Sequence, residues 1–198
     1  MRRKWNVIWL ILLLLSGCAL EDVKEPVESL KPEKPQVVLA ESDKRAYNKA
    51  LKDIKAKRYK KALTILNKLL KKYPDAAGPL ANKGIVYVRQ NKQDKAEEFF
   101  LKALDRNEKL VQVRNHLAVI YRKKGKFSEA KDMLDAAIAT DPYYANAYYN
   151  LGILYELYLQ VPEKALENYQ LYLDLKKQGD KRVAQWVSLL QRQLKAAK

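Results

Sequence analysis

The chain has 198 residues and a formal net charge of +16, from 39 Lys and Arg against 23 Asp and Glu. Its one histidine and one cysteine leave no Cys/His pair and no cluster of metal ligands, and its six glycines are scattered rather than gathered in a phosphate-binding loop. We therefore predict that the protein is not an enzyme and has no cofactor and no metal.

The first 17 residues have the pattern of an export signal. A basic start at residues 2–4 precedes an apolar run from Trp5 to Leu15, which is the order of charged and apolar regions in secretory signals. The run is too short to cross a bilayer, which takes about 20 apolar residues. We expect residues 1–17 to be a signal peptide that is removed.

The residues around the single cysteine resemble the lipobox of bacterial lipoproteins. Leu15, Ser16 and Gly17 directly precede Cys18. In that family the cysteine thiol receives a diacylglycerol group, the signal is cut before the cysteine, and the new amino terminus is acylated. The resemblance implies lipidation at Cys18. The alternatives are an ordinary signal peptide with a chance cysteine, or an uncleaved short anchor.

The same resemblance implies a location. Ala19 follows the cysteine, whereas an aspartate there tends to hold lipoproteins of enterobacteria-like cells at the inner membrane. We therefore expect attachment to the outer membrane, facing the periplasm. An acylated Cys18 also leaves no free thiol in an oxidising compartment.

Residues 18–42 are predicted to form a tether. Pro26, Pro32 and Pro35 interrupt any helix, and large apolar residues are few and scattered among Glu and Lys. A flexible coil of this length spans about 28 Å on average.

From residue 43 the sequence repeats with a period of 34 residues, in the segments 43–76, 77–110, 111–144 and 145–179. Small residues recur at two places: Gly84, Ala118 and Gly152 at one, and Ala62, Ala96, Ala130 and Ala165 at the other. The fourth segment carries one extra residue near Val161-Pro162. Apolar residues at steps of three and four predict amphipathic helices, and the small residues mark close helix contacts.

This pattern resembles the tetratricopeptide repeat, a helix–turn–helix unit of about 34 residues. The stretch Tyr148-Tyr149-Asn150-Leu151-Gly152, followed by Tyr155, is close to the family pattern. The resemblance implies an all-α fold: a right-handed α-solenoid of about four units. Residues 180–198 then form a terminal capping helix, with a partner-binding or membrane-surface helix as the alternative.

The first helices of such units line one side of the stack, and six residues there are candidates for binding a partner. An asparagine recurs at the sixth place of two units, and relatives that clamp peptide carboxylates use an asparagine there together with Lys or Arg. The candidates are Asn82, Asn115, His116, Arg122, Tyr149 and Asn150. Hydrogen bonding to a neighbouring helix is the alternative role for the asparagines.

The charge is concentrated in the first repeat, which has twelve Lys and Arg against three Asp and Glu. One hypothesis is that this repeat contacts anionic lipid headgroups, because each basic residue near such a surface contributes roughly 1 kcal/mol. The alternative is a solvated face that aids solubility. Export and the lack of a recognition motif argue against nucleic acid as the partner.

Together these features predict a non-catalytic adaptor that binds an envelope protein or peptide. Its resemblance extends to type IV pilus pilotins, lipoproteins that help secretin rings reach the outer membrane. The second hypothesis is an adaptor that recruits cell-wall hydrolases or proteases, or serves outer-membrane protein insertion. An enzyme or a carbohydrate-binding protein is the third.

Overall fold

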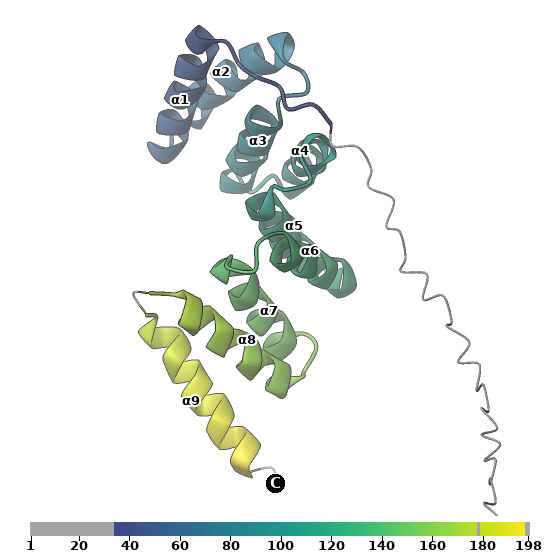
Figure 1. Cartoon of the computed structure of the whole chain (residues 1–198), viewed down its shortest axis with the longest axis vertical. Coiled ribbons are helices and arrows are strands. Elements are labelled where there is room, and N and C mark those ends of the chain that lie inside the picture. Colours follow the sequence, from purple (N-terminus) through teal and green to yellow (C-terminus); the bar gives the residue numbers. More distant parts are fainter. Residues whose placement is uncertain (1–33, 178, 197–198) are drawn as a thin grey trace, which may run out of the picture. The chain divides into compact units, whose positions relative to one another are not determined.

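The computed structural model describes residues 34–177 and 179–196, and within them it contains nine helices and no strand (Figure 1). The predicted signal peptide and Cys18 lie outside the described residues, as does most of the predicted tether. In chain order the helices are α1 (Glu41–Lys55), α2 (Tyr59–Lys72), α3 (Ala77–Arg89), α4 (Gln93–Arg106), α5 (Val111–Lys123), α6 (Phe127–Thr140), α7 (Ala145–Leu157), α8 (Pro162–Leu175) and α9 (Lys181–Ala196).

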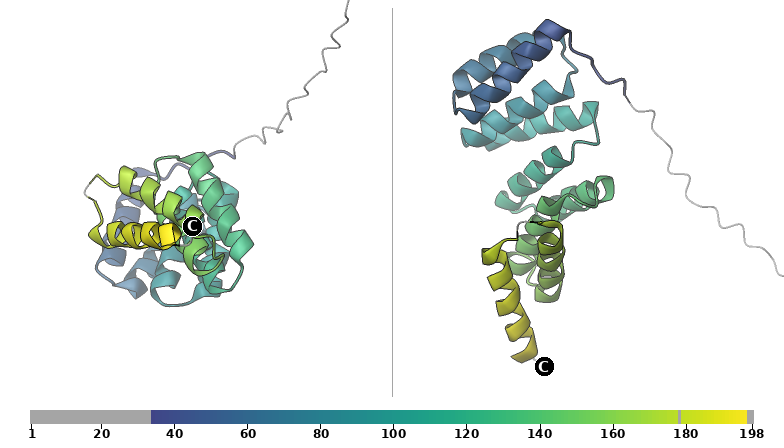
Figure 2. Two further views of the ribbon diagram at one scale, coloured as in Figure 1. Left: turned by 90° about the horizontal axis from the view of Figure 1, so that it is seen from below. Right: turned by 60° about the vertical axis from the view of Figure 1, so that its left-hand side comes forward.

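The helices form four antiparallel hairpins that stack in chain order, and α9 closes the series (Figure 2). Each first helix packs mainly on the second helix of its own hairpin, and each second helix packs on the next first helix. Because α3, α5 and α7 begin at Ala77, Val111 and Ala145, the helices repeat with the 34-residue spacing of the sequence. The predicted all-α helical repeat fold is confirmed.

The turn inside each hairpin contains one residue in the left-handed conformation. Asn91 and Gly125 occupy the same place in repeats 2 and 3, with φ of 57° and 75°. In repeat 4 the left-handed residue is Gln160, with φ of 55°, one residue later in the register. The extra residue of the fourth segment therefore lies in this turn. The second helix begins one residue later, and the pattern of residues within each helix is unchanged.

Small residues allow the two helices of a hairpin to approach closely. A Cβ atom on Gly84 would lie 2.5 Å from the Phe100 ring, and one on Gly152 would lie 2.3 Å from the Tyr169 ring. Those distances are well inside van der Waals contact, so each ring occupies the space that a larger residue would need.

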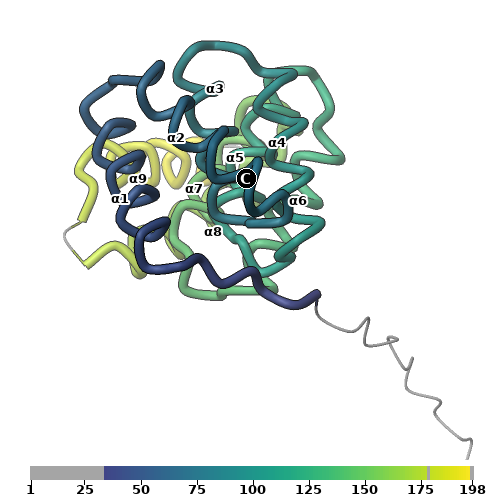
Figure 3. The backbone as a smooth tube through the Cα atoms, turned by 90° about the horizontal axis from the view of Figure 1, so that it is seen from above, coloured from purple at the N-terminus to yellow at the C-terminus, as the bar shows by residue number. Residues whose placement is uncertain are grey.

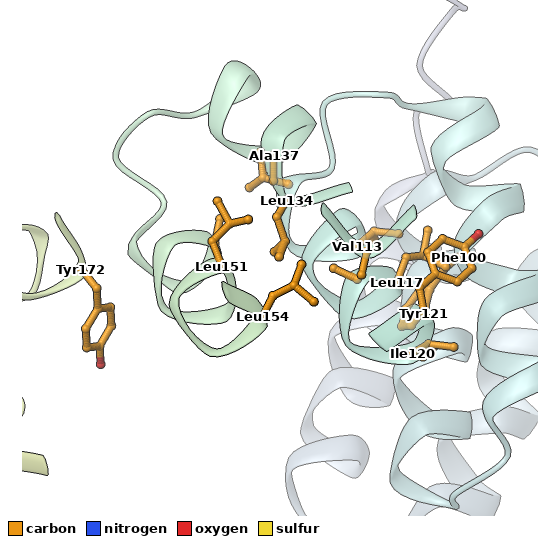
Figure 4. Packing of buried hydrophobic residues seen from close by; sticks show 14 of the residues in the cluster. Phe100, Val113, Leu117, Ile120, Tyr121, Leu134, Ala137, Leu151, Leu154 and Tyr172 are labelled. Carbon is orange, nitrogen blue, oxygen red and sulfur yellow. The ribbon is translucent and has the colours of Figure 1, made fainter. Parts of the chain in front are cut away.

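The hydrophobic core extends along the stack of hairpins instead of forming one central cluster. Figure 4 shows Phe100, Leu117 and Tyr121 packed between neighbouring helices, with Leu134 and Leu154 further along the chain. Each hairpin buries its apolar side only by contact with the next hairpin, as in other repeat arrays.

Helix α9 packs its apolar side on α8. Val183, Val187 and Leu190 are buried, and the Trp186 ring lies 5.6 Å from the Tyr169 ring. The Oδ1 atom of Asp180 accepts hydrogen bonds from the first amides of the helix, at 3.1 Å and 3.2 Å, which is the usual N-cap arrangement. Nowhere in the described stretch is a helix both long enough and apolar enough to cross a membrane.

The part of the predicted tether that the structure describes leads directly into α1 (Figure 3), and it contacts the end of α4. Lys34 Nζ lies 2.6 Å from Asp105 Oδ1, and the Gln36 side-chain amide donates to the Arg106 carbonyl at 3.2 Å. Both contacts are exposed, so their contribution to stability is small.

Candidate partner-binding face

One side of the stack carries the candidate residues, and it is defined by their places in the repeat. We number the places of each repeat from its first residue, at 43, 77, 111 and 145. Places five, nine and thirteen are one helical turn apart, and place six is next to place five, so they share a side of each first helix. We call this side the first-helix face.

The sixth place links consecutive first helices. The side-chain amide of Asn82 donates to Tyr47 Oη at 2.6 Å, and that of Asn150 donates to Asn115 Oδ1 at 2.8 Å. Tyr47 and Asn115 both stand at place five of the preceding repeat. The structural role proposed for these asparagines therefore has direct geometric support.

These bonds restrict what the asparagines can offer a ligand. The same amide groups also donate to backbone carbonyls one turn earlier, at 3.0 Å for Asn82 and 3.1 Å for Asn150. An amide nitrogen has only two hydrogens, so both are used. What each side chain has left is its carbonyl oxygen, which accepts a hydrogen bond from a peptide N–H but does not bind a carboxylate.

His116 stands at the sixth place of repeat 3 and behaves differently. Its ring stacks on Phe100, with centroids 5.4 Å apart and planes 5° from parallel. Burial lowers the pKa of His116, and the nearby Arg89 adds to this effect. The imidazole is therefore neutral at pH 7, and it does not attract a carboxylate by charge.

Tyr149 belongs to an aromatic cluster that joins α7, α8 and α9. Its ring centroid lies 5.2 Å from that of Tyr172, 6.4 Å from that of Tyr169 and 6.2 Å from that of Trp186. Pairs at such distances attract each other beyond their simple burial. Tyr149 is only partly buried, so part of its side chain remains accessible to solvent.

Arg122 is the candidate with unused hydrogen-bonding capacity. Its Nε is buried and has no hydrogen-bond partner, and its guanidinium carbon lies 5.4 Å from the centroid of the Tyr158 ring. A guanidinium binds a carboxylate through paired donors. Arg122 is therefore a suitable anchor for an acidic group.

Two further columns lie on this face, and sequence reasoning missed the apolar one. Place nine carries the partly buried aliphatic residues Leu51, Ile85, Val119 and Ile153. Place thirteen carries the exposed basic residues Lys55, Arg89 and Lys123, and the exposed Leu157 in repeat 4. The 34-residue spacing that revealed the asparagines would also have revealed the apolar column. An apolar row beside a basic row suits an extended chain with apolar and acidic side chains.

The face continues onto α9. A surface hollow of about 390 Å³ is lined by Ala184, Gln185, Ser188, Leu189 and Arg192. Counted from Asp180, Ala184 and Arg192 stand at places five and thirteen. The terminal helix therefore carries a basic residue at place thirteen as well as covering the core, whereas repeat 4 has Leu157 at that place.

Metal binding has no support in the part of the chain that the structure describes. No group of three or more His, Cys, Asp or Glu side chains there is placed to hold an ion.

Solved structures share this fold. The Pseudomonas aeruginosa PilF structure superposes with a TM-score of 0.70 at 22% identity, covering 79% of this chain and 70% of that one. A crystal structure of MamA gives 0.65 at 24%, covering 77% and 82%. At these identities the likeness concerns the fold alone.

A third neighbour has a ligand. The first TPR of Spaghetti (RPAP3), bound to the HSP90 peptide SRMEEVD, has a TM-score of 0.55 at 25% identity and covers 60% of this chain and 94% of that one. No curated protein matches the chain in sequence. The pattern of the family described as the Psidin N-terminal TPR repeats region matches residues 48–155. That match covers more than half of the chain, so the protein belongs to this tetratricopeptide-repeat family.

Proposed function

We propose that the protein is a non-catalytic adaptor that binds an acidic, extended segment of an envelope protein along the first-helix face. The observation that carries the proposal is the basic row at place thirteen, which runs beside the apolar row at place nine. Tetratricopeptide repeats are in general non-catalytic scaffolds for protein–protein interaction. The Spaghetti neighbour is bound to a peptide with two Glu and one Asp, which matches the charge of this face.

The compartment is part of the proposal. Lipidation at Cys18 attaches the chain to the outer membrane on its periplasmic side, and the basic first repeat contacts anionic lipid. The most favoured pathway is pilus and secretin assembly, because the sequence resembles pilotins. Recruitment of cell-wall hydrolases or proteases, or service to outer-membrane protein insertion, is the second candidate.

Site-specific crosslinking in cells tests the adaptor role. A photoreactive amino acid at Val119, on the first-helix face, is compared with one at Leu101, which is exposed on the second helix α4. We expect a defined protein adduct from Val119 and none from Leu101. Equal labelling from both positions, or labelling from neither, refutes binding on this face.

Charge reversal then tests the acidic partner. Arg89→Glu with Lys123→Glu reverses two exposed charges of the basic row. Lys102→Glu with Lys131→Glu makes the same change in net charge on second helices, at the loss of two weak surface ion pairs. We expect the Val119 adduct to disappear only in the first pair. The identity of the adduct, a secretin subunit or a cell-wall enzyme, decides between the two pathways.

The anchor has its own test, which does not depend on the partner. Mass spectrometry of the purified protein should show an acylated amino-terminal Cys18, and Cys18→Ala should release the protein from the membrane fraction. An unmodified cysteine in a mature or uncleaved chain contradicts the lipoprotein assignment.

A further inference from the structure

Place eleven distinguishes the first repeat from the other three. Tyr87, Tyr121 and Tyr155 stand there in repeats 2 to 4, whereas repeat 1 has Asp53. The backbone is the same in spite of this difference. The carbonyl of Asp53 accepts the Arg58 amide at 2.8 Å, and that of Tyr87 accepts the Lys92 amide at 2.9 Å.

In repeat 2 two aromatic rings fill the space beside place eleven. The rings of Tyr87 and Phe99 lie 5.5 Å apart. Lys83 Nζ lies 4.0 Å from the Phe99 centroid, and Lys95 Nζ lies 5.9 Å from the Tyr87 centroid. Each lysine thus lies over a ring, which a cation favours.

Repeat 1 keeps both lysines and lacks both rings. Lys49 and Lys61 correspond to the two lysines, and Asp53 and Ile65 replace Tyr87 and Phe99. The exchange leaves a surface pocket of about 480 Å³. Its lining residues are Lys49, Asp53, Arg58, Lys61, Thr64 and Ile65.

The carboxylate of Asp53 has an unsatisfied oxygen at this pocket. The Asp53 side chain is 3% exposed, and its Oδ1 accepts the Arg58 Nε at 2.7 Å. Its Oδ2 is buried and has no hydrogen-bond partner. A buried carboxylate oxygen without a donor costs free energy, so a ligand that brings a donor gains affinity here.

We propose that this pocket binds a phosphoethanolamine group, a small zwitterion with a primary ammonium close to a phosphate. The ammonium donates to Asp53 Oδ2, and the phosphate lies against Lys49 and Lys61. Such a ligand matches both signs of charge in the wall. A bare anion leaves the carboxylate oxygen unpaired, and a bare cation is repelled by the surrounding basic side chains.

Oδ2 is buried in the present conformation, so a ligand reaches it only when neighbouring side chains move. Lys49 and Lys61 are exposed, and their long side chains rearrange at low cost. The source of the group is either a phospholipid headgroup or a free metabolite. This site is separate from the first-helix face, so its test does not depend on the partner.

Titration of the full chain with soluble compounds tests the pocket. Amide chemical shifts of repeat 1 are followed with phosphoethanolamine, with phosphocholine, whose ammonium has no N–H to donate, and with inorganic phosphate. We expect saturable shifts around Asp53 and at least tenfold tighter binding of phosphoethanolamine than of the other two. Equal affinity for all three means attraction by charge alone and overturns the proposal.

Two substitutions complete the test. Asp53→Tyr restores the residue of the other repeats and should fill the pocket, which abolishes binding while the chain stays folded. Asp53→Asn keeps the shape and should lose the preference for phosphoethanolamine over phosphate. Retained selectivity in Asp53→Asn, or a resonance that shows a Lys49 or Lys61 ammonium already fixed on Asp53, refutes the assignment.

Vesicles identify the source of the group. Vesicles of phosphatidylcholine are compared with vesicles that also contain phosphatidylethanolamine or anionic phosphatidylglycerol. Asp53-dependent binding to the phosphatidylethanolamine vesicles indicates the lipid headgroup, and soluble binding without vesicle binding indicates the free compound. If only phosphatidylglycerol vesicles bind, and Asp53→Tyr binds them equally, charge alone accounts for the contact and the proposed site does not exist.

Discussion

Replacing Gly152 by alanine is a sharp test of the packing inside a hairpin. The added Cβ would lie 2.3 Å from Cε1 of Tyr169, and ordinary contact begins at 3.4 Å, so the ring must retreat by about 1.1 Å. Tyr169 is fully buried, and its hydroxyl donates to Glu156 Oε2 at 2.7 Å. Retreat of the ring therefore strains the core and also breaks or lengthens that hydrogen bond.

The expected loss of stability follows from three contributions. Overpacking of a core costs about 1–3 kcal/mol, and a hydrogen bond to a charged group contributes about 1.5–3 kcal/mol. Alanine in place of glycine in a helix offsets about 0.5–1 kcal/mol. We expect Gly152→Ala to lower the free energy of unfolding by at least about 1.5 kcal/mol, which corresponds to at least about 3 °C in Tm for a chain of this size.

Urea unfolding followed by circular dichroism measures this change, and Gly78→Ala is the matched control. There the added Cβ would lie 2.8 Å from the hydroxyl of Tyr47, whose small movement lengthens only its hydrogen bond with Asn82. We therefore expect a smaller loss of stability from Gly78→Ala than from Gly152→Ala. A Gly152→Ala protein as stable as the original, or more stable, would show that the close approach of α7 to Tyr169 is not a constraint.

Three further predictions concern single contacts. Burial lowers the pKa of His116 in the folded chain, so the unfolded chain binds the proton at a higher pH than the folded chain does. The free energy of unfolding is therefore highest above about pH 6.5 and declines below it. In urea titrations at pH 7 and pH 5.5, His116→Gln should remove that decline; an equal decline in the variant assigns it to other groups. Asn150→Ala leaves the acceptor oxygen of Asn115 without its donor and should cost about 1–3 kcal/mol; a neutral result would remove the structural role. Lys124→Ala breaks two ion pairs at 2.6 Å, but exposed pairs contribute little, so a loss above about 1 kcal/mol would contradict this view.

The sequence predicted the repeat well because the relevant signal is periodic. Gly84 and Gly152 stand where a ring from the second helix needs space, and the other two hairpins have the small residues Ala50 and Ala118 at the same place. The extra residue of the fourth segment was also visible, since Val161-Pro162 begins the second helix one residue late. Such features depend only on the near neighbours in the chain.

The binding face was only partly predictable. Asn82 and Asn150 were found by their spacing, but spacing does not show that their amide hydrogens are already used. That depends on the residue at place five of the previous repeat, which is Tyr47 in one case and Asn115 in the other. The unpaired Nε of Arg122 likewise follows from packing of several helices, which no local pattern encodes.

The pocket in the first repeat was missed for a different reason. In the sequence Asp53 looks like one more charged residue on a helix rich in lysine. Only the register of the other repeats shows that it replaces a tyrosine, and only the coordinates show that its side chain is 3% exposed. A comparison of repeats within the chain, place by place, would have identified it.

The main apolar cluster of the described residues has a consequence for how the chain opens. That cluster extends from Leu80 to Leu190, and Leu70 is the one partly buried hydrophobic residue of repeat 1 that packs against it. The buried residues Ala62 and Leu66 lie outside it. Repeat 1 is also an end unit, which packs on the rest of the stack mainly through α3. Its amides should therefore exchange with solvent through sub-global openings that leave repeats 2 to 4 closed. A molecule bound to the first repeat would slow that exchange locally, so the exchange rate of the repeat 1 amides reports whether a ligand is bound there.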